Sequence, residues 1–277
     1  MREEEGRGLT RPSSKPAHPP ISAPAGDLIQ LRDVSKRYST GVVALEDVSL
    51  DVSSGEFLSI LGPSGCGKST ILRLIAGLAD VTGGELRVLG QSAEAARRST
   101  GDLALVFQEA TLMPWRTVVR NVELPLEMRG VRRGERRAEA EKALELVGLA
   151  DAGRLYPRQL SGGMKMRVSI ARALVSRPRV LLMDEPFGAL DELTRQRLQQ
   201  DLLRIWAEGE EGLTVVFVTH NVFEAAFLSQ RIAVMTDRPG RVRRVFEVDA
   251  PHPRDDAFRA SREFGKLVAD VTGALHA

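Results

Sequence analysis

A glycine-rich run at residues 62–70 has the residue types and spacing that bind phosphate. It matches the pattern G-x-x-x-x-G-K-[ST]. The glycines allow backbone N–H groups to turn inward around phosphate oxygens, and a following helix adds the partial positive charge of its N-terminus. The lysine would reach the β- and γ-phosphates of a nucleotide, the serine hydroxyl would bind Mg²⁺, and the threonine would contact the α-phosphate. The candidate nucleotide-binding residues are Gly62, Pro63, Ser64, Gly65, Cys66, Gly67, Lys68, Ser69 and Thr70.

Two adjacent carboxylates, Asp184 and Glu185, follow the apolar run 180–183. Ligand chemistry in open α/β sheets takes place at the carboxyl ends of the strands. There Asp184 would hold Mg²⁺ through water, and Glu185 would polarise the attacking water as a general base. The alternative is a strand that simply ends in solvated acids. The phosphate loop elsewhere in the chain favours the catalytic interpretation.

Strands and helices must place these groups at one edge of a sheet. Residues 56–61 form an apolar run that leads into the phosphate loop, and residues 69–76 have a helical pattern that Gly77 would end. This strand–loop–helix order argues against the alternative of a glycine-rich turn with an exposed lysine. Further strands are predicted at 103–107, 180–183 and 214–219. Continuous apolar strands of this kind suit a sheet that is covered on both faces.

The main domain is predicted to span residues 27–250 and to begin with strands at 28–31 and 43–52. A mostly helical insertion is expected at about 112–176, because apolar residues recur there at helical spacing. Examples are Ala140, Ala143, Leu144 and Val147.

The two ends of the chain are expected to lie outside this domain. Residues 1–26 contain five prolines and little that is bulky and apolar. Such a segment cannot bury enough surface to offset its ordering entropy, so a disordered tail is predicted. Residues 251–277 are expected to form a helical C-terminal tail.

Composition narrows the class of protein. The 277 residues carry a net charge of only +2, which argues against a nucleic-acid partner. The apolar runs are a few residues long, whereas a membrane-spanning helix needs ~20, so we expect any work at a membrane to require another subunit. The single cysteine, Cys66, cannot form an intrachain disulfide and suggests a reducing compartment. Its side chain is interpreted as a small filler. The alternative is a thiol whose modification would block the phosphate cradle.

Residues 160–167, with the sequence LSGGMKMR, resemble the signature motif of ABC ATPases. Further residues fall in that family's order. Gln108 matches the Q-loop, Ala189-Leu190-Asp191 the D-loop, His220 the switch histidine, and Tyr38 the aromatic residue that stacks on adenine. The resemblance covers about 28–245. It implies a P-loop NTPase fold of the α/β class, with a RecA-like core, an N-terminal antiparallel β subdomain and an inserted helical subdomain.

The resemblance also implies roles for these residues, with ATP and Mg²⁺ as ligands. Ser161, Gly162 and Gly163 would bind the γ-phosphate of ATP held by a second copy, in a head-to-tail dimer with two-fold symmetry. His220 would contact the γ-phosphate, Gln108 would reach Mg²⁺ and the attacking water, and Asp191 would lie near the nucleotide. A lone histidine at a strand end or a surface tyrosine at 38 would otherwise need no such role. The placement of both in the family's order favours the functional interpretation.

Two positions depart from the commonest family pattern. Met164 stands where the signature usually has glutamine, and Asn221 stands where aspartate often follows the histidine. Neither change removes a phosphate ligand, so we expect activity to survive.

The segment 112–118, with the sequence LMPWRTV, resembles the nitrate, sulfonate and taurine importer branch, as do residues 121–126, 187–191 and 239–242. The nearest resemblance is to an aliphatic sulfonate or taurine import ATPase. Met113-Pro114-Trp115 lies where family members receive the permease. Trp115 would be an exposed contact there, or alternatively a core residue of the helical insertion.

The resemblance therefore predicts an ATPase that energises an importer of a small anion or organosulfur or nitrogen solute. It would sit peripherally on the cytoplasmic face of the membrane, bound to permease subunits and served indirectly by a solute-binding protein. An alternative is a non-transport ABC ATPase acting on nucleic acid or ribosomes, but long coiled coils and a second ATPase domain are not predicted. An inactive nucleotide-binding module is disfavoured by Lys68, Asp184, Glu185 and His220. The sequence does not identify the transported solute.

Overall fold

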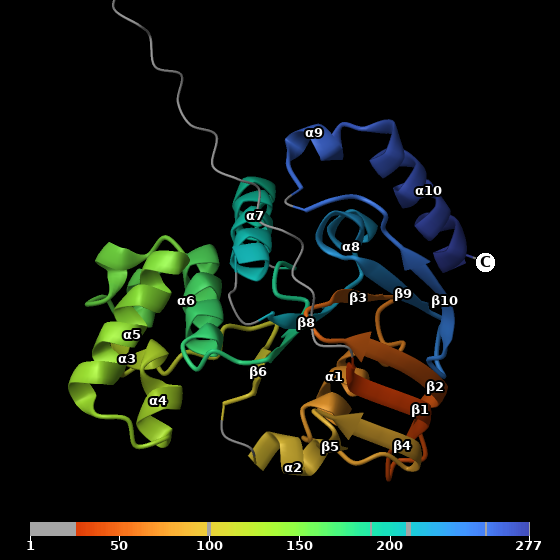
Figure 1. Ribbon diagram of the computed structural model, residues 1–277, viewed down its shortest axis with the longest axis horizontal. Helices are drawn as coiled ribbons and strands as arrows, with labels where there is room; N and C mark the ends of the chain where they lie inside the picture. Colours follow the sequence, from red (N-terminus) through yellow and green to blue (C-terminus); the bar gives the residue numbers. More distant parts are fainter. Residues whose placement is uncertain (1–25, 99–100, 189, 209–211, 253, 277) are drawn as a thin grey trace, which may run out of the picture.

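The computed structural model describes residues 26–98, 101–188, 190–208, 212–252 and 254–276. The predicted disordered tail therefore lies outside the described residues, apart from Gly26, and so does Ala189 of the D-loop. Two sheets form the body of the molecule (Figure 1). The strand order of the larger sheet is β10-β9-β3-β8-β7-β6, and that of the smaller is β2-β1-β4-β5.

The larger sheet is parallel except at one edge. Strands β6 (Leu103–Val106), β7 (Val180–Asp184), β8 (Thr214–Thr219), β3 (Phe57–Leu61) and β9 (Arg231–Met235) run parallel. Strand β10 (Val242–Glu247) pairs with β9 in the antiparallel sense. Strands β3 and β7 both pair with β8 and run parallel to it. The phosphate loop after β3 and the two carboxylates at the end of β7 therefore emerge at the same carboxyl edge of the sheet. This is the arrangement that the sequence predicted.

Alternate residues of the central strands enter two different cores. In β3, Leu58 and Ile60 pack with helix α1 (Lys68–Ile75) and the smaller sheet. Phe57 and Leu61 point into the other core, which contains helices α7 (Glu192–Glu208) and α8 (Val222–Leu228). Both faces of the sheet are covered, which explains why its strands are continuously apolar.

The smaller sheet is antiparallel and comes from the N-terminal part of the chain. Its strands are β1 (Asp27–Arg37), β2 (Val43–Ser53), β4 (Gly83–Val88) and β5 (Gln91–Ser92), and a short helix α2 (Ala93–Arg98) follows. Strand β1 is longer than the predicted 28–31, and β4, β5 and α2 were not predicted. The predicted fold class, with an antiparallel N-terminal part and a helical insertion, is confirmed.

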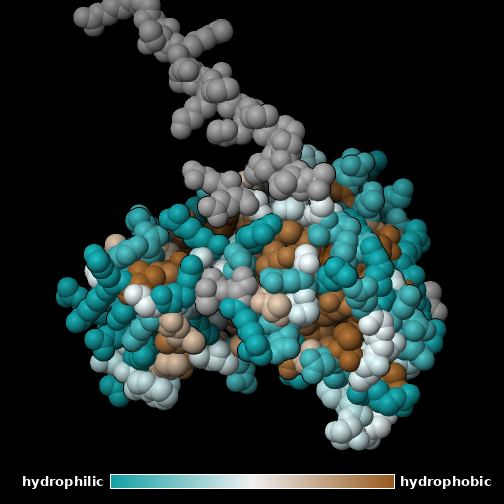
Figure 2. Space-filling model, turned by 60° about the horizontal axis from the view of Figure 1, so that its bottom comes forward, coloured by the Kyte–Doolittle hydropathy of each residue, from teal (hydrophilic) through white to brown (hydrophobic). Residues whose placement is uncertain are grey.

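The helical insertion forms a lobe to one side of the sheets (Figure 1, green). Its helices are α3 (Val118–Val122), α4 (Leu124–Met128), α5 (Arg133–Leu146) and α6 (Gly162–Leu174), with 3₁₀ turns at Ala150–Ala152 and Pro157–Gln159. The apolar residues that predicted α5 are buried. In the space-filling view this lobe projects from the body, and the outline is indented between the two (Figure 2).

The C-terminal segment contains α9 (Asp256–Arg259) and α10 (Arg262–His276), and it packs against the body. Phe264 and Val271 of α10 belong to the core that contains α8. Arg254 is buried, and its Nη1 donates to the carbonyls of Ala226, Phe227 and Ser229 at 3.0, 3.0 and 2.9 Å. These carbonyls lie at the end of α8, so Arg254 ties the C-terminal segment to that helix.

At the amino edge of the large sheet a buried ion pair holds the strands together. The Glu56 carboxylate lies 2.9 Å from Arg231 Nη1 and accepts the Ser53 N–H at 2.8 Å. The Glu56 pKa is raised, because burial disfavours the charged form more than the contacts favour it. Nearby, Thr214 Oγ1 accepts the Gly55 N–H at 2.9 Å. Glu56, Gly55 and Thr214 thus satisfy one another's polar groups, or those of their neighbours, within the chain.

Within the described ranges, no helix is both long and apolar enough to cross a bilayer. The face shown in Figure 2 is largely hydrophilic, with apolar groups set among polar ones.

Candidate active site

The phosphate loop joins β3 to α1 and needs glycine for its shape. Gly65 and Gly67 have φ values of +79° and +107°, a region that side chains strain. A Cβ on Gly67 would also lie 2.6 Å from Leu45 Cδ2 and 2.8 Å from the Ala44 carbonyl oxygen. Gly67 directly precedes α1, so its conformation determines where the helix N-terminus points.

Lys68 lies at the base of this loop, 4% exposed. Its ammonium donates to the carbonyls of Gly62 and Pro63, both at 2.8 Å, and lies 3.6 Å from Glu185 Oε1. A buried ammonium requires such partners. The lysine is thereby held between the loop and the carboxylate at the end of β7, where it can bind anionic oxygens.

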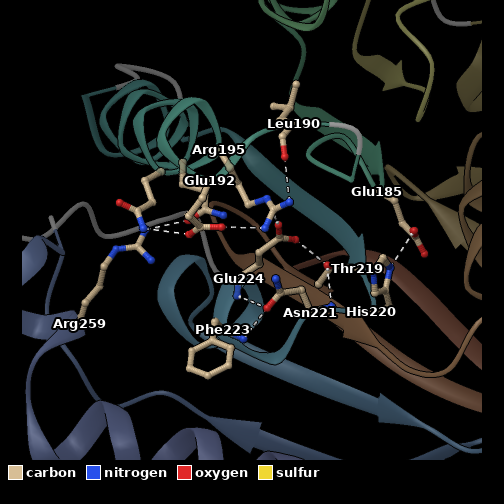
Figure 3. Close-up of polar contacts among 12 residues, drawn as sticks. Glu185, Leu190, Glu192, Arg195, Thr219, His220, Asn221, Phe223, Glu224 and Arg259 are labelled. Carbon is tan, nitrogen blue, oxygen red and sulfur yellow. Dashed lines mark hydrogen bonds and ion pairs between the residues drawn. The ribbon is translucent and has the colours of Figure 1, made fainter. Parts of the chain in front are cut away.

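The adjacent carboxylates Asp184 and Glu185 have different surroundings. Asp184 Oδ1 accepts the hydroxyl hydrogen of Ser69 at 2.8 Å, and burial raises the Asp184 pKa. Glu185 has a φ of +43°, which is uncommon for a non-glycine residue. Its Oε2 lies 2.9 Å from His220 Nδ1 at the end of β8 (Figure 3). The carboxylate therefore lies between the lysine and the histidine.

Most of the predicted nucleotide-binding residues line one cavity of about 330 Å³. Its lining is Tyr38, Val42, Ala44, Ser64, Gly65, Gly67, Lys68, Ser69, Thr70, Gln108, Glu185 and Arg238. The Tyr38 hydroxyl lies 3.2 Å from Thr70 Oγ1, so the tyrosine belongs to this site and is not an isolated surface aromatic. Cys66 lies behind the loop, 1% exposed, in the core that contains β3 and α1.

The oxygen atoms of Ser69 and Asp184 form a small hard-ligand set. In the part of the chain that the structure describes, no group of three or more histidine, cysteine, aspartate or glutamate side chains could hold a metal ion. A Mg²⁺ ion that is bound mainly by substrate phosphates and water needs only one or two protein ligands. The residues present therefore fit such an ion.

The signature residues lie elsewhere. Ser161 caps α6, because its Oγ accepts the Met164 N–H at 3.2 Å, and Ser161 and Gly162 are exposed. They are absent from the cavity lining given above, and Figure 1 shows α6 in the helical lobe, well away from α1. The exposed N-terminus of α6 could bind a second anion, and the chain does not direct it at its own phosphate loop. Met164 is partly buried against the hydrophobic core.

Asp191 starts α7 next to this surface. Its Oδ1 accepts the Thr194 N–H at 3.0 Å, and the contact lowers the Asp191 pKa. A Cβ on Gly163 would lie 2.5 Å from Thr194 Cγ2. Gly163 is therefore required for the close approach of α6 to the start of α7.

The loop that carries Trp115 is rigidly held. Asn121 is fully buried; its Oδ1 accepts the Met113 N–H at 2.7 Å, and its Nδ2 donates to the carbonyls of Met113, Arg116 and Thr117. Trp115 itself is 73% exposed, which excludes the alternative of a core tryptophan.

Two arginines with no predicted role support the site. Arg172 donates to the carbonyls of Ala110 and Thr111 at 3.1 and 3.0 Å and so fixes the segment that follows Gln108. Arg238 donates to the Gly65 carbonyl from Nε and Nη2 at 3.1 and 2.8 Å and lines the cavity. The residues next to Arg172 and Arg238 in the sequence do not predict these contacts, because the contacts depend on how distant segments pack.

Comparison with known proteins agrees with the motifs. The family model described as ABC transporter matches residues 45–188. A taurine import ATP-binding protein of Rhizobium johnstonii is 43% identical over 87% of this chain and 92% of its own length. A nitrate import ATP-binding protein of Synechocystis sp. is 44% identical over 87% and 91%. An aliphatic sulfonates import ATP-binding protein of Cupriavidus necator is 44% identical over 95% and 83%.

The fold of this chain is also similar to that of a solved ATP-binding cassette. A dimeric ATP-binding cassette in a post-hydrolysis state, bound to ADP and phosphate, is similar with a TM-score of 0.71 at 36% identity. The similarity covers 80% of this chain and 100% of that one.

Proposed function

The chain belongs to the ABC transporter family, and from this premise we propose that it is the ATP-hydrolysing subunit of an importer for a small anionic or zwitterionic solute. Sulfonates, taurine and nitrate are the candidate class, because relatives named for their import align over most of this chain. Neither the family model nor these relatives favours the alternative of an ATPase that acts on nucleic acid or ribosomes.

The observation that carries the proposal is the position of Glu185 between Lys68 at 3.6 Å and His220 at 2.9 Å, beside the phosphate loop. In our mechanism the loop amides and Lys68 bind the ATP phosphates, and Tyr38 stacks on the adenine. Glu185 accepts a proton from the water that attacks the γ-phosphate, and His220 keeps the carboxylate oriented toward that water. The bond between the β–γ bridging oxygen and the γ-phosphorus breaks, which leaves ADP and phosphate.

Ser69 and Asp184 would hold Mg²⁺, and Gln108, which lines the same cavity as Ser69, would reach it too. The contact of 2.8 Å between Ser69 Oγ and Asp184 Oδ1 supports this assignment, because it brings together a hydroxyl and a carboxylate oxygen, the ligand types that Mg²⁺ prefers either directly or through water. The ion would neutralise negative charge on the phosphate oxygens.

We further propose that two copies form a head-to-tail dimer. Ser161, Gly162 and Gly163 of one copy would face the phosphate loop of the other, and Asp191 would lie at the same interface. The exposure of the α6 N-terminus supports this arrangement, as does the dimeric state of the similar cassette. Each phosphate loop is then half of a complete site.

The permease would bind the Gln108 loop and Met113-Pro114-Trp115. An exposed tryptophan on a loop fixed by Asn121 is a rigid contact that loses little side-chain entropy on binding. The subunit would then sit peripherally on the cytoplasmic face of the membrane and meet a solute-binding protein only through the permease. The relatives' names as import ATP-binding proteins support this placement.

The test is ATP hydrolysis by the purified full chain and by Glu185→Gln. The variant should bind ATP normally, hydrolyse it at least about 100-fold more slowly and form a dimer that persists in ATP, because general-base catalysis is lost while the phosphate contacts remain. Gel filtration with ATP and steady-state phosphate release measure both effects. Turnover close to wild type would contradict the assignment of Glu185.

A further inference from the structure

Glu224, in the first turn of α8, is a buried carboxylate outside the site described above. It is 5% exposed, and burial raises its pKa. Its Oε2 accepts the Thr219 hydroxyl hydrogen at 2.6 Å, and its Oε1 lies 3.5 Å from Arg195 Nε. Burying a carboxylate is unfavourable unless charged and hydrogen-bonding partners compensate. The partners of the Glu224 carboxylate, Thr219 and Arg195, indicate its role.

The first partner fixes the backbone on both sides of His220. Thr219 Oγ1 donates to Glu224 and also accepts the Asn221 N–H at 3.0 Å. Asn221 Oδ1 in turn accepts the N–H groups of Phe223 and Glu224 at the start of α8. The His220 side chain is itself 55% exposed, and Glu185 is its hydrogen-bond partner. The position of this histidine against Glu185 is therefore determined mainly by the segment that Glu224 anchors.

The second partner holds the start of α7. Arg195 Nη2 donates to the Leu190 carbonyl at 3.0 Å, and Nη1 donates to Glu192 at 2.9 Å (Figure 3). Leu190 directly precedes Asp191. One guanidinium thus contacts both the D-loop segment and the carboxylate that anchors the histidine. A series of contacts connects Leu190 to Glu185 through Arg195, Glu224 and the 219–220 segment (Figure 3).

The contact between Arg195 and Glu224 is not fully formed. At 3.5 Å it is longer than a charge-assisted hydrogen bond, and Arg195 Nε is buried with no hydrogen-bond acceptor among the described residues. A shift of well under 1 Å at the start of α7 would close it, and such a small displacement can switch an element between two arrangements. By contrast, the Glu56–Arg231 pair at the other edge of the sheet is already formed at 2.9 Å.

We propose that Arg195 and Glu224 are positioning residues that couple the Leu190–Asp191 segment to His220. This inference rests on the proposed function. Neither residue touches substrate. When the second copy displaces Asp191, Arg195 closes on Glu224, and the Thr219–Asn221 segment then holds His220 firmly in the contact that it already makes with Glu185. Assembly of the dimer and alignment of the hydrolytic residues would in this way be linked within each chain.

The experiment compares full-length Glu224→Gln and Arg195→Gln with Glu56→Gln as the matched control. The first two variants keep a hydrogen-bonding amide in place but remove one charge of the pair. The control makes the same change in a buried glutamate–arginine pair at the opposite edge of the sheet. We expect kcat to fall about 10-fold in Glu224→Gln and in Arg195→Gln, with KM for ATP within about twofold. The double variant should be no slower than either single variant, because the two residues act as a unit.

Glu56→Gln should retain kcat within about twofold at a temperature where all variants are folded. Arg195→Lys provides a second check if a glutamine variant folds poorly. It keeps the charge near Glu224 but cannot also hold Leu190, so it should fold and still turn over slowly. Wild-type kcat in Glu224→Gln, Arg195→Gln and Arg195→Lys, or an equal loss in Glu56→Gln, would overturn the inference. A wild-type chain without ATPase activity, or an unaffected Glu185→Gln, would instead overturn the proposed function.

Discussion

The two edges of the large sheet are built from the same strands but differ in how their polar groups are satisfied. At the amino edge the Glu56 carboxylate contacts Arg231 and Ser53, so its partners are all residues of the same chain. Positive φ angles occur at both edges, at Gly55 and Arg177 as well as at Gly67 and Glu185, but at the carboxyl edge Lys68 and Glu185 line a cavity and His220 is 55% exposed. Charged groups that face a cavity cost stability and are retained where they serve a reaction. We therefore expect one edge of the sheet to stabilise the fold and the other to perform chemistry.

Substitutions at either edge test whether stability and activity depend on different edges of the sheet. A change at the carboxyl edge should alter nucleotide binding or turnover and leave unfolding nearly unchanged. A change at the amino edge should do the reverse. A substitution that altered both properties to the same degree would show that the two edges are not separable.

Lys68→Ala should have the largest effect. The substitution removes the ammonium that binds the β- and γ-phosphates, so the Kd for ATP should rise at least about 100-fold, equivalent to about 2.8 kcal/mol. The fold should tolerate the substitution, because the desolvation cost of burying the ammonium offsets its hydrogen bonds to Gly62 and Pro63 and its contact at 3.6 Å with Glu185. Titration calorimetry measures the Kd, and thermal unfolding without nucleotide measures stability. Tight ATP binding by this variant would place the phosphates elsewhere.

Glu56→Gln should have an intermediate effect on stability and almost none on turnover. The change leaves Arg231 without its carboxylate, and the arginine is 29% exposed, so we expect the free energy of unfolding to fall by about 1–2 kcal/mol. Urea denaturation measures this quantity. A fall in kcat that matched the loss of stability would contradict the separation of the two edges.

The contribution of Glu56 to the free energy of unfolding should also depend on pH. Burial raises the Glu56 pKa above 4.5, so the folded chain binds this proton more tightly than the unfolded chain does. The contribution of Glu56 to stability is therefore greatest at acidic pH and declines as the pH rises through the folded pKa. The stability difference between wild type and Glu56→Gln should shrink over that interval. A difference that grew with pH would mean that the pair lowers the pKa.

Local patterns were sufficient to predict the parts of the site that consecutive residues build. The strand of 56–61, its glycine loop and the following helix agree with β3 and α1 to within one residue. The signature residues 161–163 also form a local feature, in which Ser161 caps α6. These features depend on backbone geometry and helix capping, which neighbouring residues determine.

Contacts between distant segments were not predictable from one sequence. Arg238 reaches Gly65 only because β9 pairs with β3, and Arg195 reaches Glu224 only because α7 packs beside α8. The sequence leaves two alternatives for Trp115, and only its exposure of 73% in the folded chain excludes the core position. An isolated arginine or glutamate carries no periodicity that indicates its partner, so such residues become visible only with the fold.

Cys66→Ser should have the smallest effect, although the residue lies within the phosphate loop. Cys66 is 1% exposed and packs behind the loop, where serine has nearly the same volume, so ATP affinity should change by no more than about twofold. Burial raises the pKa of the Cys66 thiol, so less thiolate is present at neutral pH than in a free cysteine. Maleimide should therefore react slowly at pH 7 and faster near pH 9, and the adduct should block ATP binding because it displaces the loop. Full ATPase activity after labelling verified by mass spectrometry would show that the loop tolerates the adduct, and that the carboxyl edge is less tightly packed than the amino edge.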